Sequence, residues 1–111
     1  MLERGSLDES SSPLVGEAFG ELVRVRNVVI EQIVSSASPD PIDYCQSHDE
    51  WVVVLSGAAR LDVGGTEVRL AAGEWVLIRA LTRHRVLATE AATRWLAVHV
   101  YPNGSEPSIT R

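Results

Sequence analysis

A series of short segments rich in β-branched residues, separated by turn signals, is the feature that most constrains the fold of this chain. Such residues favour strands, and turn signals spaced by about 8–12 residues are typical of β-sandwiches and barrels. The expected strands are 27–35, 50–56, 59–63, 66–70, 75–79, 84–89 and 94–101, with a two-residue hairpin turn at Gly64-Gly65. Residues 17–22 are expected to form a short helical turn. The sequence therefore predicts an all-β domain.

Length and composition indicate a single domain. A chain of 111 residues is near the common domain size, and a hydrophobic content of 45% is ordinary for a globular protein. The serine-rich segment 1–13 and the segment 102–111 are expected to be flexible tails. The folded body is then expected at 14–101.

Several classes of partner and location are disfavoured. The longest apolar run, 51–55, is far shorter than the ~20 residues of a membrane span, and no secretory signal is recognised, so we expect no membrane partner. A net charge of −5 argues against nucleic acid, which requires a basic face. A single cysteine, Cys45, excludes an intrachain disulfide and fits a cytoplasmic location.

Two segments place polar, ligand-capable side chains beside apolar strands. In the first, Tyr44 and Gln46 precede Glu50, which is separated by six residues from Gly57. In the second, Gly73 is followed by Arg79 and then by His84, the histidine that ends the segment.

These segments resemble the two motifs of the cupin superfamily. The first motif reads His-x-His, three or four residues, Glu, six residues, Gly; the second reads Gly, five residues, Pro-x-Gly, two residues, His. Tyr44 and Gln46 stand where the first motif has its histidines, and Arg79 stands where cupins usually have proline. The chain also resembles a branch of small bacterial single-domain cupins in segments 30–35, 44–46, 49–52, 81–86 and 95–99.

The resemblance implies a double-stranded β-helix, or jelly-roll, barrel with a site inside it. It implies that Gln46, Glu50 and His84 could bind a divalent transition metal (Zn, Fe, Mn or Ni), with Tyr44 at the edge of the site. The resemblance also implies that Glu50 and Tyr44 are the catalytic residues, which would transfer a proton.

Strand alternation gives Tyr44, Gln46, His48 and Glu50 a common direction, and the resemblance points Glu50 into the barrel. A buried carboxylate needs a partner, and a metal, a protonated His84 or the Tyr44 hydroxyl would each serve. The cluster is then a metal or acid/base site, or an inert hydrogen-bonded network.

Six other side chains have open roles. His48 is either a substitute ligand or, as we expect for a loop histidine, exposed to solvent; the face of His99 is left open, because period two alone does not say which side is inside. Cys45, of opposite parity to Gln46, is expected to be a small buried residue facing away from the site. Arg79, Arg83 and Arg85 bracket His84 and form either an anion clamp at the pocket mouth or an ordinary solvated surface.

Three functions fit these observations: a metal-dependent enzyme of the oxygenase, isomerase or lyase type, a binding module or metal-free acid/base enzyme for a small organic ligand, and a protein–protein element. A homodimer is expected, because Trp51, Val53 and Leu55 would form an apolar outward face that a monomer seldom exposes.

Overall fold

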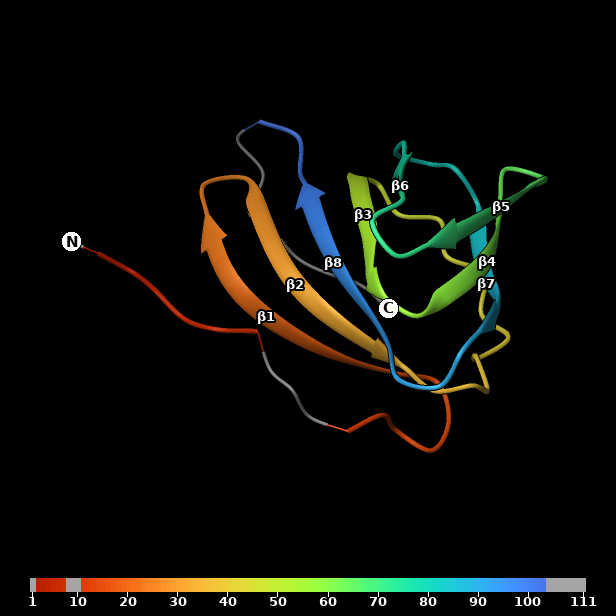
Figure 1. Ribbon diagram of the computed structural model, residues 1–111. Helices are drawn as coiled ribbons and strands as arrows, with labels where there is room; N and C mark the ends of the chain where they lie inside the picture. The colour runs from red at the N-terminus through yellow and green to blue at the C-terminus, as the bar shows by residue number, and fades with distance from the viewer. Residues whose placement is uncertain (1, 8–10, 104–111) are drawn as a thin grey trace.

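The computed structural model describes residues 2–7 and 11–103 of the chain. Its regular elements are eight β-strands: β1 (Glu17–Val25), β2 (Val28–Ser35), β3 (Asp49–Ser56), β4 (Ala58–Val63), β5 (Thr66–Ala71), β6 (Trp75–Ile78), β7 (His84–Thr89) and β8 (Thr93–Val100) (Figure 1). The prediction of an all-β domain is confirmed. Each expected strand is present, with ends that shift by one residue at most.

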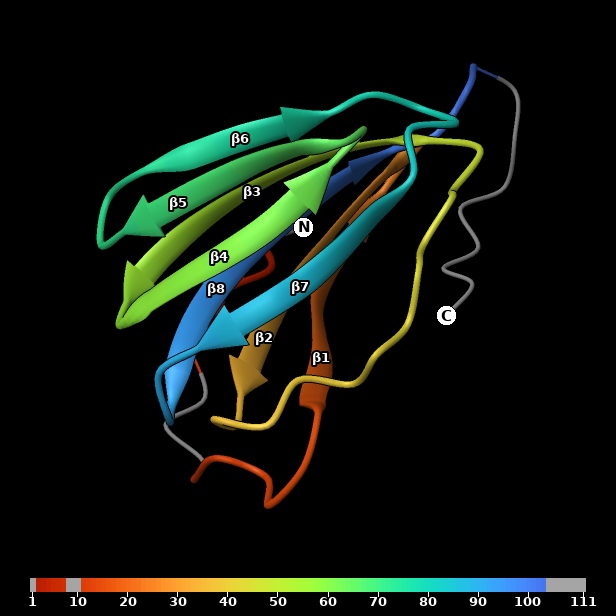
Figure 2. The same cartoon turned by 90° about the vertical axis from the view of Figure 1, so that its right-hand side faces the viewer.

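The strands form two antiparallel sheets that pack face to face. One sheet has the order β1-β2-β8-β3-β6 and the other the order β5-β4-β7 (Figure 2). The crossing connections, which place β8 between β2 and β3, are those of a jelly roll. The predicted jelly-roll barrel is therefore confirmed.

The core lies between the sheets and follows the alternation of the strands. On β3 and β8, buried residues alternate with partly buried ones. The apolar core consists of Ile33, Val52, Val54, Ala59, Leu61, Leu70, Ile78, Trp95 and Ala97. Toward one end of the barrel the same inward-facing positions carry polar side chains, among them Glu31, Glu50 and His99. The polar site is thus a continuation of the core.

The expected helical turn at 17–22 is wrong, because these residues belong to β1. Strand β1 pairs with β2 from Glu17↔Ser35 to Val25↔Val28, with an irregularity between Glu21 and Val23. The backbone of an edge segment gains its hydrogen bonds from the neighbouring strand, and this pairing overrides a weak local helical preference. Strands β1 and β2 together form one wall of the site.

The structure describes only part of the two expected tails, 1–13 and 102–111. Residues 8–10 and 104–111 fall outside the described residues, so the flexible tails stay a prediction. In the part of the chain that is described, Ser12 Oγ donates a hydrogen bond to the Ser35 carbonyl at 3.1 Å. Within the same part, no helix is long and apolar enough to cross a membrane.

Candidate functional site

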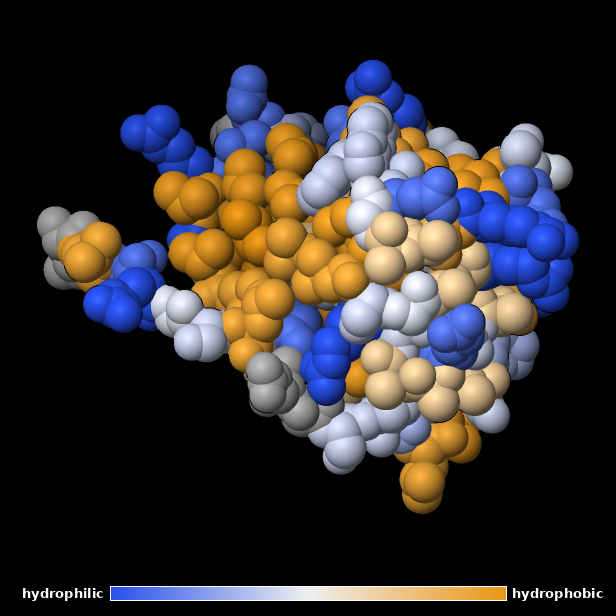
Figure 3. Space-filling model, in the orientation of Figure 1, coloured by the Kyte–Doolittle hydropathy of each residue, from blue (hydrophilic) through white to orange (hydrophobic). Residues whose placement is uncertain are grey.

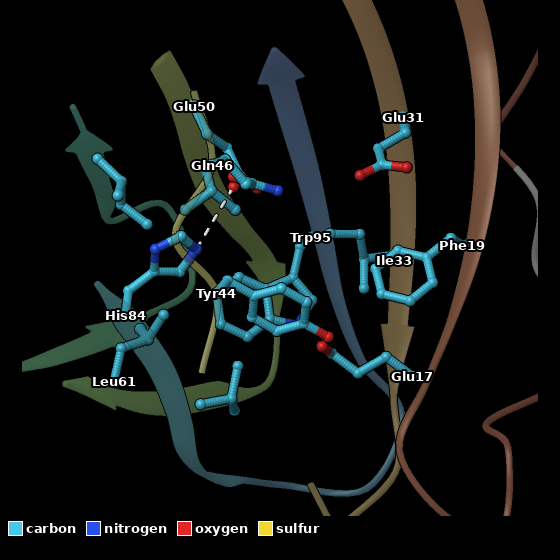
Figure 4. A pocket seen from close by; sticks show the side chains of 13 residues that line it. Glu17, Phe19, Glu31, Ile33, Tyr44, Gln46, Glu50, Leu61, His84 and Trp95 are labelled. Carbon is cyan, nitrogen blue, oxygen red and sulfur yellow. Dashed lines mark ion pairs between the residues drawn. The ribbon is translucent and has the colours of Figure 1, made fainter. Parts of the chain in front are cut away.

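A pocket opens into the barrel between the two sheets and is lined by side chains from β1, β2, β3, β4, β6, β7, β8 and the loop before β3. Its lining residues are Glu17, Phe19, Glu31, Ile33, Tyr44, Gln46, Glu50, Val52, Leu61, Ile78, His84, Val86 and Trp95. Figure 4 shows Gln46, Glu50 and His84 on one side of the pocket and Glu17, Phe19 and Glu31 on the other. Tyr44, Gln46, Glu50 and His84, the four residues singled out in the sequence, line this one pocket.

Backbone hydrogen bonds fasten the loop that carries Tyr44 and Gln46 to the strand that carries His84. The Tyr44 N–H donates to the His84 carbonyl at 2.8 Å, and the His84 N–H donates back to the Tyr44 carbonyl at 2.9 Å. The Leu81 N–H donates to the Gln46 carbonyl at 2.7 Å. The relative positions of the three site residues are therefore set by the backbone.

The His84 ring is held with its Nε2 atom directed at Glu50. Its Nδ1 lies 3.0 Å from the Thr82 carbonyl oxygen, which can only accept, so Nδ1 donates. In the neutral ring, Nε2 then carries the lone pair. Tyr44 stacks on the same ring with centroids 5.7 Å apart, which limits its rotation. His84 is pre-oriented to accept a proton or a metal ion at Nε2.

The Glu50 carboxylate lies between two imidazoles. Its Oε1 is 3.8 Å from His84 Nε2 (dashed in Figure 4), and its Oε2 is 4.0 Å from His99 Nε2. Both separations exceed a hydrogen bond. Two donors to a tetrahedral ion at about 2.1 Å would lie about 3.4 Å apart, so the His84–Glu50 separation suits a shared ion after a small adjustment.

Gln46 adds a buried oxygen atom to the polar side chains of the pocket. Its Oε1 atom is buried and has no hydrogen-bond partner among the described residues. A buried amide oxygen without a partner is costly, so native structures usually satisfy it with protein, water or an ion. The residue that replaces a motif histidine thus offers the pocket a neutral oxygen donor.

A second polar group lies beside the first, on β2, β8 and the start of β3. His99 Nε2 donates to Glu31 Oε1 at 2.7 Å, and His99 Nδ1 lies 2.8 Å from His48 Nε2. The His48 ring stacks on Tyr101 with centroids 4.2 Å apart. His99 is fully buried and Glu31 is 3% exposed. This chain of hydrogen bonds satisfies groups that would otherwise be very costly to bury.

The donor atoms fit a divalent metal in two overlapping ways. Gln46, Glu50 and His84 combine a neutral oxygen, a carboxylate and an imidazole, a mixed set that suits borderline transition metals. Glu31, Glu50 and His99 are buried and offer ligand atoms that all lie within 4.8 Å of one another. Glu50 belongs to both sets. The ligand and catalytic roles of Gln46, Glu50, His84 and Tyr44 stay predictions.

Two expectations about neighbouring residues are wrong. His48 was expected in solvent but is 4% exposed, and it does not line the pocket, because a bend at residues 47–48 interrupts the alternation and turns its ring toward Tyr101. Cys45 was expected to be buried but is exposed. Cys45 is not among the residues that line the pocket.

The arginines near His84 do not reach the pocket. Arg85 Nε donates to Asp43 Oδ1 at 2.7 Å, and Arg83 lies 3.9 Å from the other oxygen of the same carboxylate. The Arg85 hydrogen bond, with the nearby charges of Arg85 and Arg83, holds the pKa of Asp43 below its usual range. Arg79 is exposed. Of the two interpretations, the solvated surface describes these residues.

Sequence reasoning missed the contributions of Glu17, Glu31 and His99. Glu31 carries a signal, because it shares the parity of the apolar residues Val29 and Ile33 on a strand with a buried face. His99 shares the parity of Trp95 and Ala97. Such a residue can be placed inside the barrel only once the buried face of its strand is known. The sequence alone did not say which face of the strand that carries His99 is buried. Glu17 carried no signal, because its segment was expected to be helical.

The fold and site define a class: a small jelly-roll barrel with a polar pocket between its sheets. The family model of the cupin domain matches residues 37–99, more than half of the chain. The chain belongs to the cupin family, and the resemblance of its motifs is confirmed. No curated protein matches the sequence.

Several solved structures are similar. A candidate mannose-6-phosphate isomerase from Ralstonia eutropha is 35% identical with a TM-score of 0.75, covering 91% of this chain and 100% of that one. An RmlC-like cupin from Shewanella frigidimarina is 14% identical with a TM-score of 0.74, covering 93% and 95%. The iron(II) form of HppE is 19% identical with a TM-score of 0.67, covering 76% and 50%. The last two likenesses bear on the fold alone.

Proposed function

We propose that this protein binds a divalent transition metal together with a small organic ligand in the barrel pocket, and that it acts as a metal-dependent enzyme. One observation carries the proposal. The Glu50 carboxylate lies 3.8 Å from the lone-pair nitrogen of His84, beside the buried and unpartnered Gln46 oxygen. An imidazole nitrogen, a carboxylate and an amide oxygen that line one pocket form a donor set that suits a divalent transition metal.

In this proposal Gln46, Glu50 and His84 hold the ion, and Zn, Fe, Mn and Ni are the candidates. A bound ion of this kind supplies Lewis acidity and a template for the ligand. The reaction would be of the oxygenase, isomerase or lyase type. Tyr44, stacked on His84 at the pocket wall, orients the ligand and carries a phenol proton that it can donate. The apolar wall of Ile33, Leu61 and Trp95 excludes water from that exchange.

A second candidate function is a non-catalytic binding module or a metal-free acid/base enzyme. The hydrogen bond of 2.7 Å between His99 and Glu31 favours it, because it satisfies part of the polar group without an ion. The absence of both first-motif histidines points the same way. In this case Glu50 and His84 would exchange protons with the ligand directly.

Elemental analysis of protein purified without a metal-affinity tag separates the two candidates. We expect about one transition-metal ion per chain, and His84→Ala should lose it while keeping the β-sheet circular dichroism of the wild type, because His84 is the imidazole of the ligand set. Arg83→Ala, an exposed neighbour, is the control and should keep the ion.

The possible outcomes have distinct meanings. A clean apo protein that also fails to bind added Zn²⁺ would favour the second candidate. Unchanged metal content in His84→Ala would move the ion to Glu31, Glu50 and His99. Unfolding of His84→Ala would show a structural role for this histidine.

We also propose that the protein is a cytoplasmic homodimer whose interface is the outer face of the five-stranded sheet. Exposed apolar residues gather on strands of this sheet: Leu22 and Val25 on β1, Leu55 on β3, Trp75 and Leu77 on β6, and Val100 on β8. Figure 3 shows a continuous apolar area over the same sheet. A patch of this kind is typical of a protein interface, and twofold pairing is the commonest way to cover one.

A further inference from the structure

We propose that the organic ligand of the barrel pocket is a small cation, whose ammonium group faces Glu17 and Glu31. The inference rests on the proposed function, since it concerns the same pocket, and it adds the charge class of the ligand. Three observations support it: the sign of the charges in the pocket wall, the positions of the arginines, and the aromatic lining.

The pocket wall is rich in carboxylates. Glu17, Glu31 and Glu50 all line it, and His84 is the basic residue among its lining side chains. In the proposed function the ion lies at Glu50 and His84, on one side of the pocket. Glu17 on β1 and Glu31 on β2 add two carboxylates from the wall opposite His84 (Figure 4), and an oxygen of Glu31 also lies within 4.8 Å of a ligand atom of Glu50.

Both of these carboxylates are held in place from behind. Ser35 Oγ donates to Glu17 Oε2 at 2.6 Å, and Trp95 Nε1 donates to the same Ser35 oxygen at 2.9 Å. Glu31 is held by His99 at 2.7 Å. Acceptors fixed in this way do not need to reorganise when a charged donor arrives, so their attraction for a cation is stronger than that of mobile surface carboxylates.

Positive side chains are kept out of the pocket. Within the part of the chain that the structure describes, no arginine lines it, and the sequence contains no lysine. Arg83 and Arg85 are both directed to Asp43. Apart from the proposed ion, a phosphate or carboxylate on the ligand would find no arginine beside Glu17 and Glu31 among the described residues that line the pocket, and in a partly apolar cavity the repulsion is weakly screened. A phosphorylated ligand, which the name of the Ralstonia structure suggests, does not fit this wall.

The aromatic rings of the pocket and its small volume also suit a small organic cation. Phe19, Tyr44 and Trp95 line the pocket, and the faces of such rings attract cations within about 6 Å. The cavity offers about 50 Å³ to the centres of water-sized molecules, which suits a ligand of a few heavy atoms. A short alkylammonium would place its charge between the carboxylates and its carbon chain on the rings and on Ile33.

The test uses three probes of similar size and different charge: propylammonium, 1-propanol and propionate, together with inorganic phosphate. Each is titrated by calorimetry into full-length protein stripped of metal with a chelator, so that an open coordination position cannot bind the anions, and binding of Zn²⁺ is measured separately. We expect propylammonium to bind at least about tenfold more tightly than 1-propanol, since a hydrogen bond to a charged group contributes about 1.5–3 kcal/mol. Propionate and phosphate should not bind measurably.

Two charge-neutralising variants locate the effect. Glu17→Gln should weaken propylammonium binding about tenfold and leave 1-propanol and Zn²⁺ unchanged. Glu67→Gln removes the same charge from β5, where Glu67 pairs with Arg60 and Arg69 at the surface, and should change nothing. Equal losses in both variants would show a general electrostatic effect and would overturn the assignment to Glu17.

The remaining outcomes separate this inference from the proposed function. Zn²⁺ binding without any preference for propylammonium would overturn the cation assignment and leave the metal site standing. Tighter binding of propionate or phosphate would overturn it as well. Preference for propylammonium in protein that does not bind Zn²⁺ would support the cation assignment and contradict the metal.

Discussion

Glu50 is the residue on which the two polar groups of the barrel converge. Its carboxylate approaches His84 through one oxygen and His99 through the other. The sequence identified Glu50 and His84 because both hold motif positions at fixed spacing. It left the face of His99 open, and the partner of His99, Glu31, lies 68 positions away in the chain. Contacts of that range depend on sheet register, which local patterns do not specify.

His99→Ala should destabilise the protein strongly. The substitution removes the hydrogen bonds of His99 to buried Glu31 and His48 and leaves a cavity in their place, which suggests a loss of about 2–4 kcal/mol in the free energy of unfolding. Urea denaturation of the variant and the wild type measures it.

His84→Ala is the matched comparison for His99→Ala. It removes one hydrogen bond to the Thr82 carbonyl at a residue that lines a cavity, so it should cost only about 0.5–1.5 kcal/mol. If the two variants lost equal stability, the separation of a structural His99 from a functional His84 would be wrong.

At the scale of the elements, Gly57 ends β3 in a backbone conformation that other residues rarely adopt. Its φ is +89°, and a Cβ built on it would collide with the Oγ1 and Cα atoms of Thr93. The last glycine of the first motif therefore allows β3 to turn into β4 directly against the start of β8. The motif's spacing predicted the glycine's place in the fold, but the neighbour that requires it was visible only in the structure.

Gly57→Ala should cost about 2–4 kcal/mol of stability, from backbone strain and from the collision with Thr93. Gly65→Ala is the control, because Gly65 has the same φ of +89° but open space around it. Strain alone should cost about 1–2 kcal/mol there. Thermal unfolding of both variants gives the comparison, and equal losses would exclude the collision as a cause.

The Asp43–Arg85 pair links the loop that carries Tyr44 to β7. Hydrogen bonding from Arg85 lowers the pKa of Asp43 in the folded state. A carboxyl with a lowered pKa stabilises the fold above its unfolded pKa, and this contribution is lost as the pH falls through the folded value. The pair therefore contributes at neutral pH and not in strong acid.

Asp43→Asn should lower the melting temperature slightly at pH 7, and the difference from wild type should shrink as the pH falls below the ordinary carboxyl pKa of about 3.9 and vanish once the carboxyl is protonated in the folded state as well. Added salt should also reduce it, because the pair is exposed to solvent. Melting curves across pH measure this, with Arg85→Gln expected to behave in the same way. A difference that persists unchanged in acid would refute the ionic explanation.

At the scale of the whole molecule, the outer face of the five-stranded sheet exposes apolar residues, and this exposure is the basis of the proposed dimer. Trp51 and Trp75 lie side by side on β3 and β6, with ring centroids 6.0 Å apart, and Trp75 is 59% exposed. The sequence expected an apolar outward face on β3 alone. The structure extends it across the sheet, because β6 and β8 flank β3.

Sedimentation at micromolar concentration should give a species of twice the 12.1 kDa chain mass. Trp75→Glu should shift it to the monomer, since a charge buried in an apolar interface is left unpaired. Leu87→Glu, at an exposed apolar residue of the opposite sheet, should leave the dimer intact. A wild-type monomer at this concentration would contradict the proposed dimer.

The sequence by itself determined the all-β class, the strand positions and the family, because alternation, turn residues and motif spacing are local properties. It also determined that Tyr44, Gln46, Glu50 and His84 belong together, through the resemblance. Only the tertiary structure decided that Glu17, Glu31 and His99 join them, that His48 is buried and that the arginines face away. These facts depend on which strands pair and which face is inside, and no residue carries that information alone.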